Sequence, residues 1–392
     1  MPSRWQHVLD DELCTESFWS DRDSHEAGPT ATDPPKQVEI AILGDGFVGA
    51  AAALALAARG KDVCLVPTTP RSAVLDEAGL GLIAKSAGRH IAAQPPLFLA
   101  AASPMDFRHL AQQSDESMQT RSNLIGASDQ WEVMGSAYYQ GGLLINDGGA
   151  LDVPVALAHL QGAAREEGAH YTDGFRAVAA HAGEWTLDLA GGECLASTLL
   201  VTAPVDSSNT AIASPFTVPS QYLVTEPVPL ELVATICPRM IPIRELSRCG
   251  YEFRMDPSGR RFMFRAPEKS DRLGPREAAL RLYPELLSRW PQLRGIRLTH
   301  SWAGTAWYSS RTGAAPSPDN VYHAWGSGCD AAALVDLGIK TGNALADGRA
   351  PQNMPVNIPV NIPAPAWLRP LTGAYRRWAD RRARRELNDK ED

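Results

Sequence analysis

The chain has 392 residues, 44% of them hydrophobic, and its 37 lysine and arginine side chains are outnumbered by 45 aspartates and glutamates. The net charge of −8 argues against nucleic acid as a partner, because phosphate binding needs a surplus of basic side chains. The six cysteines form no Cys-x-x-Cys pair, the N-terminal residues lack the apolar run of a signal peptide, and no stretch is long and apolar enough to span a membrane. We therefore expect a cytoplasmic protein without a metal site or a membrane span.

The first predicted elements form a βαβ unit. Residues 38–43 are a short apolar run typical of a buried strand. Residues 50–59 are rich in alanine and leucine and predict a helix, which Gly60 ends. Residues 63–66 predict a second strand, so the unit has the order and length of a nucleotide-binding motif.

A glycine-rich turn joins the first strand to the helix. It reads Gly44-Asp45-Gly46-Phe47-Val48-Gly49, the GxGxxG pattern. Gly44 permits the tight turn, Gly46 lets the backbone approach a pyrophosphate at the helix N-terminus, and Gly49 lets helix and strand pack closely. Because the pattern lies inside a complete βαβ unit, it predicts a dinucleotide-binding fold.

One part of this motif is absent. An acidic residue usually ends the second strand and accepts hydrogen bonds from the ribose of the dinucleotide. Its position falls at Pro67, whose side chain has no acceptor. Either Thr68, Thr69 or a water replaces it, or ribose binding is weakened; Arg71 would also allow a 2′-phosphate on the ribose.

The remaining chain alternates between helical and strand-like runs. Residues 70–134 are rich in alanine, serine and glutamine and predict helices and loops, and residues 222–266 predict β-structure with a hairpin turn at 257–259. Other expected helices are 153–167, 273–290 and 331–345, and other expected strands are 174–180, 185–189, 199–202, 298–308 and 321–324. The C-terminus has a linker-like Pro-Val-Asn-Ile-Pro duplication and an arginine-rich end. This end favours a solvated helix or a contact with a protein partner over one with an anionic membrane.

Several short motifs follow one another along the chain. They are the fingerprint turn, Leu151-Asp152-Val153-Pro154 with Ala163-Ala164-Arg165, Gln221-Tyr222-Leu223-Val224, Phe253-Arg254 with Gly259-Arg260-Arg261-Phe262, Trp302-Ala303-Gly304, and Gly326-Ser327-Gly328. As an ordered set, they resemble the D-amino-acid oxidase superfamily of FAD-dependent oxidoreductases. The resemblance is to its branch of glycine, sarcosine and gamma-glutamylputrescine oxidases.

The resemblance implies an α/β fold, with a Rossmann-like FAD-binding lobe of the GR2/DAO type and an antiparallel β-sheet substrate domain. It implies an enzyme that uses FAD to oxidise the C–N bond of a small amine or amino acid to an imine. The flavin accepts the electrons and the protein supplies orientation and electrostatics. The cofactor-binding residues would be the fingerprint turn, Thr68, Gly326, Ser327 and Gly328.

The resemblance also implies a division of the chain. Residues 1–36 would be an N-terminal extension. The FAD-binding lobe would comprise residues 37–105, 145–215 and 300–350, and the substrate domain residues 106–144 and 216–299. Residues 351–392 would form a C-terminal strap and basic helix.

Other positions depart from the family pattern. The loop that wraps the flavin has Glu77-Ala78 in place of Arg-Asn, and the turn over the flavin has Cys329-Asp330 in place of His-Gly. A negative Asp330 there would disfavour an anionic reduced flavin. The cysteine that tethers flavin in sarcosine oxidases corresponds to Ala306, so we expect noncovalent FAD. These departures leave a second hypothesis open, a pseudoenzyme or a subunit of a hetero-oligomer that binds flavin weakly.

The substrate is expected beneath the hairpin that roofs the substrate in the family. Arg254 would pair with a carboxylate, beside an apolar wall of Tyr251 and Phe253. The alternative is that Arg254 faces water. Tyr308 is a further candidate, although roof packing suits an aromatic side chain better than chemistry. No catalytic acid or base is identified, because the nine histidines form no dyad.

Overall fold

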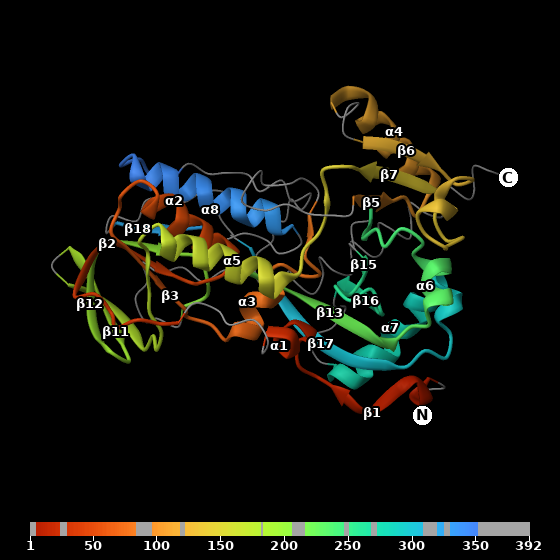
Figure 1. The fold of residues 1–392 in the computed structure, drawn as a ribbon, viewed down its shortest axis with the longest axis horizontal. Helices are drawn as coiled ribbons and strands as arrows, with labels where there is room; N and C mark the ends of the chain where they lie inside the picture. Colours follow the sequence, from red (N-terminus) through yellow and green to blue (C-terminus); the bar gives the residue numbers. More distant parts are fainter. Residues whose placement is uncertain are drawn as a thin grey trace.

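The computed structural model describes residues 5–23, 30–83, 96–117, 122–181, 183–205, 216–246, 251–267, 273–308, 320–324 and 330–351. These residues form two halves, each built around one large β-sheet (Figure 1). The seven-stranded sheet lies at the left of Figure 1 and the nine-stranded sheet at the right. Helices α1 (Phe18–Asp23) and α3 (Arg71–Glu77) lie where the two halves meet.

The seven-stranded sheet contains the βαβ unit. Its order is β10-β11-β12-β2-β3-β9, and β18 also pairs with β12. The strands are β2 (Gln37–Leu43), β3 (Val63–Val66), β9 (His170–Tyr171), β10 (Ala177–His181), β11 (Glu184–Leu189), β12 (Gly192–Val201) and β18 (Val321–His323). The pairs that join β18, β12, β2, β3 and β9 are parallel, so the carboxyl ends of these strands lie at one edge. Ligands of such sheets bind outside this edge.

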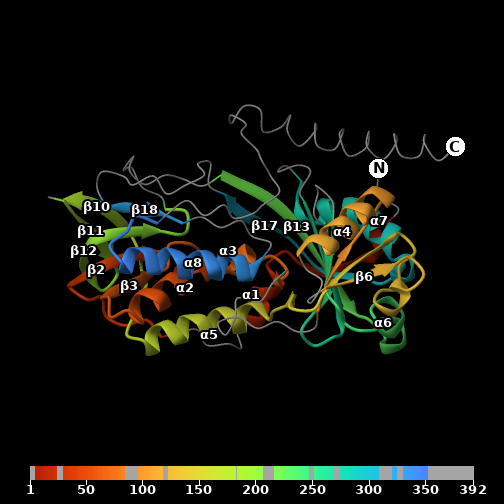
Figure 2. The same cartoon turned by 90° about the horizontal axis from the view of Figure 1, so that it is seen from above.

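Three helices cover one face of this sheet side by side, α2 (Phe47–Ala57), α5 (Val153–Glu166) and α8 (Ala331–Ala346) (Figure 2). Every residue of α2 is buried, because α2 contains only small or apolar residues and packs between the sheet, α5 and α8. The contact with α8 is close: a Cβ on Gly338 would lie 2.4 Å from the carbonyl oxygen of Val48.

The nine-stranded sheet is mostly antiparallel. Its order is β1-β17-β13-β16-β15-β14-β5-β7-β6. The strands are β1 (Leu9–Cys14), β5 (Leu97–Ala100), β6 (Ser122–Gly126), β7 (Gly141–Ile145), β13 (Phe216–Pro227), β14 (Ile243–Glu245), β15 (Glu252–Met255), β16 (Arg261–Pro267) and β17 (Leu298–Tyr308). Helices α4 (Pro104–Ser117), α6 (Leu230–Ile236) and α7 (Pro275–Arg289) belong to this half, and β4 (Leu82–Ile83) pairs separately with β8 (Gly149–Ala150). Short 3₁₀ helices are Gln6–Val8, Gln130–Glu132 and Pro291–Leu293.

The two faces of the nine-stranded sheet differ in character. Phe253, Phe262 and Phe264 point to one face, into an apolar core that they share with Trp290. The opposite face includes Tyr222 and Met263, which belong to the core that also contains α2, α5 and α8. Glu252, Arg254 and Arg265 share this second face, since side chains alternate along a strand and these residues pair with or alternate around Met263.

Most of the elements expected from the sequence are present. Strands β3 and β17 coincide with the predicted residues 63–66 and 298–308, and the four predicted helices correspond to α2, α5, α7 and α8 within three residues at each end. The turn at 257–259 does join β15 to β16. The expectation for residues 70–134 was wrong in part, because β4, β5 and β6 lie there beside α3 and α4.

The expected domain boundaries stay a proposal, but strand pairing departs from them at three places. Strand β1 lies within the supposed N-terminal extension, and β5 and most of β17 lie within the supposed FAD-binding lobe. All three are strands of the nine-stranded sheet. An apolar run predicts a strand but does not reveal its partner, because pairing depends on contacts distant in sequence.

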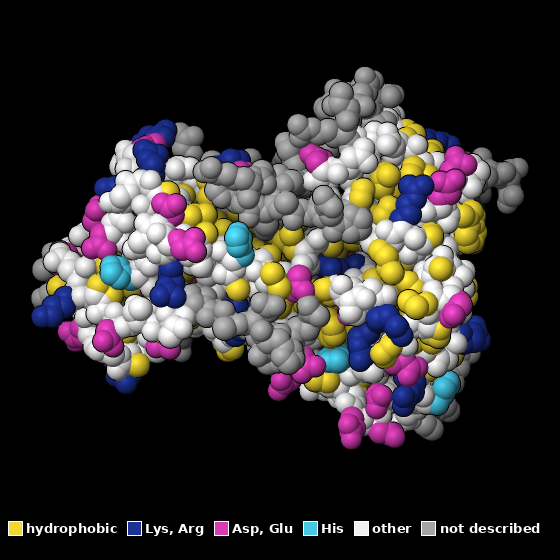
Figure 3. All heavy atoms as spheres, viewed as in Figure 1, with side chains coloured by type: hydrophobic (Ala, Val, Ile, Leu, Met, Phe, Trp, Pro, Cys, Tyr) yellow, Lys and Arg dark blue, Asp and Glu magenta, His cyan; other side chains and the backbone are white. Residues whose placement is uncertain are grey.

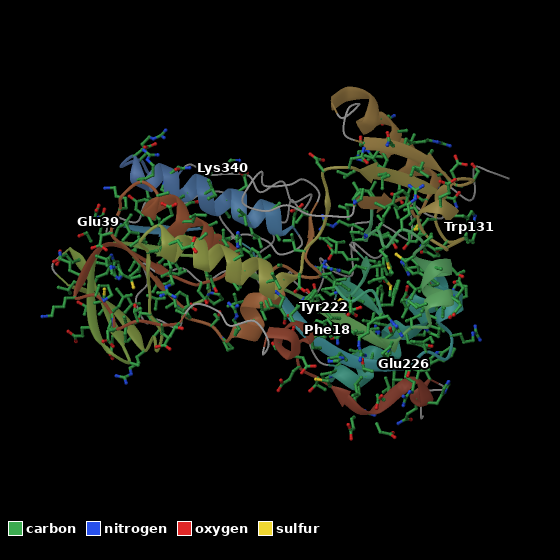
Figure 4. All side chains as sticks on the ribbon, in the orientation of Figure 1. Phe18, Glu39, Trp131, Tyr222, Glu226 and Lys340 are labelled. Carbon is green, nitrogen blue, oxygen red and sulfur yellow. The ribbon has the colours of Figure 1, made fainter. Side chains whose placement is uncertain are left out.

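The surface carries both signs of charge. Acidic and basic side chains are interspersed on the described part of the face in Figure 3. Trp131, 50% exposed, lies at the outer edge of the nine-stranded half (Figure 4). Among the described helices, none has the length and apolar character that crossing a membrane requires. The arginine-rich C-terminus lies outside the described residues.

Candidate cofactor and substrate site

The fingerprint turn has the geometry that its glycines predict. Gly44 has a φ of +117°, and its amide donates a hydrogen bond to the carbonyl oxygen of Val66 (2.8 Å), which ties the ends of β2 and β3 together. A Cβ on Gly44 would come within 2.6 Å of the Ala203 side chain. A Cβ on Gly49 would come within 1.8 Å of the Gly44 carbonyl oxygen. Side chains are therefore excluded at both positions.

Helix α2 begins within this turn, at Phe47, and its N-cap residue provides no side-chain hydrogen bond. Its N-cap is Gly46, in an extended conformation. The first amides of a helix have no partner within the helix, and together with the helix dipole they attract an anion. This arrangement fits a pyrophosphate. The assignment of residues 44–49 to the cofactor stays a prediction, and the geometry is compatible with it.

The other expected cofactor residues are less informative. The Thr68 hydroxyl donates a hydrogen bond to the carbonyl oxygen of Pro204 (3.3 Å). Its single proton is thus used within the protein, and the oxygen can act toward a cofactor only as an acceptor. Gly326, Ser327 and Gly328 lie outside the described residues.

Four polar side chains meet on the sheet face turned toward the nucleotide-binding half. We call Tyr222, Arg244, Glu252 and Arg265 the polar cluster. Glu252, 1% exposed, accepts a hydrogen bond from Arg244 Nε (3.0 Å) and lies 3.6 Å from Arg265 Nη1. The empty side-chain position of Gly79, just after α3, would be 3.6 Å from both Glu252 Oε2 and the Tyr222 hydroxyl. The cluster therefore faces the loop that follows α3.

Further contacts fix the two arginines. Arg244 Nη2 donates to the carbonyl oxygen of Leu82 (3.2 Å), and Arg244 Nη1 lies 3.8 Å from the Asp330 carboxylate at the start of α8. Arg265 Nη2 donates to Ser220 Oγ (2.8 Å). Two arginines balance Glu252 and Asp330, so this group of charges is formally neutral. Glu252 Oε2 is buried and accepts no hydrogen bond from the described residues.

The structure separates the residues that the sequence grouped around Arg254. Arg254 lies on the face of the polar cluster, but its guanidinium donates to the carbonyl oxygens of Leu80 (2.8 Å) and Leu151. Tyr251 lies on the opposite face, where its ring stacks on Phe264 and lies 4.0 Å from the Arg289 guanidinium. Neighbouring strand residues point to opposite faces, so Tyr251 and Phe253 cannot form a wall beside Arg254. That grouping was wrong.

The role of Arg254 as a substrate anchor stays a prediction; the arginines of the polar cluster are the alternative anchors. Tyr308 is the last residue of β17, and its side chain is not among those that the structure describes. Arg244, Glu252 and Arg265 were not predicted from the sequence. The signal was present in β15, where charged residues 252 and 254 alternate with aromatic residues 251 and 253, the pattern of a strand with one polar and one apolar face.

An N-terminal segment holds the loop next to the polar cluster. Ser17 Oγ and Trp302 Nε1 each donate to Asp76 Oδ1 at 2.9 Å, and Trp19 Nε1 donates to the Gly79 carbonyl oxygen at 2.9 Å. Trp302 in turn stacks on Tyr222, with 4.7 Å between ring centroids. Figure 4 shows Phe18 of this segment and Tyr222 at the junction of the two halves, where both belong to one apolar core. Burial raises the pKa of Asp76 to about 7, and the hydrogen bonds from Trp302 and Ser17 oppose that rise.

A parallel sheet, a glycine turn and an uncapped helix N-terminus together define a dinucleotide-binding protein, here joined to a second sheet that presents the polar cluster. The model of the DAO family, described as FAD dependent oxidoreductase, matches residues 72–338. This match covers more than half of the chain, so the protein belongs to the DAO family of FAD-dependent oxidoreductases, and its cofactor is FAD. The open N-terminus of α2 fits the pyrophosphate of that cofactor.

Solved structures with the same fold include two oxidases and a dehydrogenase. Glycine oxidase from Geobacillus kaustophilus is 16% identical, with 80% of this chain and 96% of that chain covered and a TM-score of 0.58. Iminodiacetate oxidase from Chelativorans sp. BNC1 is 16% identical, with 81% and 98% covered and a TM-score of 0.60. L-proline dehydrogenase from P. horikoshii is 14% identical, with 81% and 95% covered and a TM-score of 0.60. At these identities the likeness establishes the fold alone. No curated protein matches the sequence.

Proposed function

We propose that this protein oxidises the C–N bond of a small amine or amino acid to an imine, and that amino acids are its preferred substrates. When bound, FAD supplies the chemistry by accepting a hydride from the carbon next to the nitrogen. The residues of this chain bind and orient the substrate. The polar cluster is the proposed binding site, because it lies on the sheet face turned toward the nucleotide-binding half.

Glu252 is the observation on which this proposal depends. Its Oε2 is buried, accepts no hydrogen bond from the described residues, and faces the empty side-chain position of Gly79. Arg265 Nη1 lies 3.6 Å from this oxygen, which is an ion pair without a hydrogen bond, so the buried acceptor still lacks a donor, and this is costly. The amino group of a substrate provides a donor and, when protonated, a positive charge. Glu252 is therefore the proposed acceptor for the substrate nitrogen.

Arg265 and Arg244 extend the proposal to amino acids. An arginine pairs with a carboxylate through two parallel hydrogen bonds, which fixes orientation as well as charge. A zwitterionic amino acid would place its amino group at Glu252 and its carboxylate at an arginine of the cluster, and the group of charges would stay neutral. Two of the structural relatives are named as oxidases of glycine and of iminodiacetate, which both contain an amine and a carboxylate; this supports the same class here.

Anaerobic flavin reduction tests this proposal. The flavin-containing protein is mixed with glycine, sarcosine and proline, and with the matched amines that lack a carboxylate, methylamine, dimethylamine and pyrrolidine. We expect loss of the oxidised-flavin absorbance with at least one amino acid and slower loss with its matched amine. Glu252→Gln should raise KM by at least about tenfold and change kcat less, since it weakens binding of the substrate nitrogen.

Matched arginine variants locate the carboxylate. We expect Arg265→Met to raise KM for an amino acid and to leave its matched amine nearly unaffected. Arg254→Met is the control, because its guanidinium contacts backbone carbonyl oxygens and its loss should lower stability instead. The reverse result would assign the anchor to Arg254, and an unchanged KM in Glu252→Gln would contradict the role of Glu252.

A pseudoenzyme, or a subunit of a hetero-oligomeric oxidoreductase, is the second candidate function. Two observations favour it: Pro67 replaces the acid that binds ribose, and Asp330 places a carboxylate at the start of α8. A protein that retains FAD but is reduced by no amine or amino acid would belong to this class.

A further inference from the structure

Asp45, the second residue of the fingerprint turn, has a buried carboxylate at the edge of the sheet where the acid of the second strand is missing. Strand β3 runs between β2 and β9, with Leu43 opposite Val66 and Leu65 opposite Tyr171. Asp45 follows the end of β2, and its Oδ2 accepts a hydrogen bond from the Tyr171 hydroxyl (2.9 Å) at the end of β9. This hydrogen bond joins residues at the carboxyl ends of the two strands that flank β3, so the carboxylate lies near the carboxyl end of β3, which Pro67 follows.

Neighbouring side chains donate hydrogen bonds to Asp45 Oδ2, whereas Asp45 Oδ1 accepts none from the described residues. Gln161 Nε2 donates to Asp45 Oδ2 (3.1 Å) and to the Asp45 carbonyl oxygen (2.7 Å). Asp45 is 2% exposed, and its Oδ1 is buried and has no hydrogen-bond partner among the described residues. A buried acceptor without a donor is costly, so such an atom indicates a ligand that completes it. The Thr69 hydroxyl, two residues after Pro67, is also buried without a hydrogen-bond partner in the described part of the chain.

We infer that Asp45 replaces the missing strand-end acid and that its Oδ1 accepts a hydrogen bond from a ribose hydroxyl in the adenosine half of FAD. The inference depends on FAD as the cofactor but not on the proposed substrate. It assigns to an aspartate on the first turn a role that the dinucleotide fold usually gives to the end of the second strand.

The contact between Asp45 and Arg71 makes the same site unsuitable for a 2′-phosphate. Arg71 Nη1 lies 3.9 Å from Asp45 Oδ2 and donates to Gln161 Oε1 (3.3 Å). The aspartate thus offsets the arginine charge and would repel a phosphate on the ribose. Burial raises the pKa of Asp45, whereas the hydrogen bond from Tyr171 and the charge of Arg71 favour the ionised form. The site therefore suits an unmodified ribose.

Nucleotide binding to the full-length protein, after its flavin has been removed, tests this inference. The probes are ADP and 2′,3′-dideoxy-ADP, which share the diphosphate and differ only in the ribose hydroxyls. We expect the wild-type protein to bind ADP about tenfold more tightly, the effect of one hydrogen bond to a charged group. Asp45→Ala should bind both nucleotides equally and should bind dideoxy-ADP as the wild type does, because the diphosphate contact at α2 remains.

Tyr171→Phe is the matched control, since it removes a contact to Asp45 and keeps the carboxylate; we expect it to retain the preference for ADP. If Asp45→Ala lowers the affinity for both nucleotides by the same factor and keeps the ratio of the two affinities, the role of Asp45 is structural and the inference is overturned. A wild-type protein without a preference for ADP overturns it without any variant. Retention of FAD by that protein would show that the cofactor assignment survives, whereas binding of neither FAD nor ADP would contradict both.

Discussion

Two neighbouring helices of the nucleotide-binding half begin in opposite ways. Helix α2 starts at Gly46 without a side-chain cap. Helix α8 starts at Asp330, whose Oδ1 accepts hydrogen bonds from the amides of Ala332 (3.1 Å) and Ala333 (3.3 Å). The helices pack closely through Gly338 and Gly342, yet one N-terminus is open and the other is satisfied by the protein's own carboxylate.

The difference shows that the partial positive charge at two helix N-termini is used in two ways. An uncapped N-terminus stabilises an anion from outside, as a pyrophosphate requires. A capped N-terminus already contains its negative charge, and here that charge also lies 3.8 Å from Arg244 of the polar cluster. Helix α2 is thus suited to bind the cofactor, and α8 is suited to connect the nucleotide-binding half to the substrate face.

The largest expected effect comes from the open end of α2. Gly49→Ala should abolish flavin binding and destabilise the fold by about 1–3 kcal/mol or more, because its Cβ would meet the Gly44 carbonyl oxygen at 1.8 Å. Gly46→Ala should retain the fold, since the φ of −69° at this position suits alanine, but should lower FAD affinity at least about tenfold by blocking the approach of the pyrophosphate. Flavin content and thermal unfolding measure the two effects, and wild-type flavin content in Gly46→Ala would contradict the assignment.

Asp330 stabilises a helix N-terminus, whereas the buried carboxylate of Asp76 should lower stability when it ionises. Asp76 lies in the last turn of α3, and burial raises its pKa from 3.8 to about 7. The folded protein then binds more protons than the unfolded chain between about pH 4 and pH 7, so Asp76 lowers stability as the pH rises through this range. Asp76→Asn can still accept the bonds from Ser17 and Trp302 and should remove this loss, a gain of at most about 4 kcal/mol at pH 8. Melting temperatures at pH 5 and pH 8 measure it; an equal pH dependence in both proteins would show that Asp76 does not titrate there.

The smallest expected effect concerns the capped end of α8. Asp330→Ala should lower stability by about 1 kcal/mol, because two amides lose their acceptor, while Asp330→Asn should nearly preserve it. Thermal unfolding of the two variants side by side is the measurement. Equal losses would indicate that the charge facing Arg244, rather than the cap, stabilises this end.

The sequence predicted those parts of the molecule that local rules govern. The fingerprint turn needs left-handed backbone at Gly44 and no side chain at Gly49, and only glycine satisfies both, so its function can be inferred from residue type and spacing. Helices α2, α5, α7 and α8 and strand β17 were predicted to within three residues for a similar reason, since periodicity and glycine are local signals.

The polar cluster could not be predicted in the same way. Arg244, Glu252 and Arg265 lie on three strands, and their meeting depends on the register between those strands and on the loop at Gly79. Arg254 was singled out by its family motif, yet two backbone carbonyl oxygens accept its hydrogen bonds. Residue type alone does not reveal whether an arginine binds a ligand or the backbone.

The parallel pairing of β1 with β17 affects how the chain folds during synthesis. Leu9 lies opposite Leu298, so β1 leaves the ribosome long before its partner strand β17 has been made. Contacts this distant in sequence slow folding, and an unpaired strand edge in a nascent chain invites wrong association. Strand β1 therefore stays without this partner until residue 298 and the strand that follows it have been synthesised.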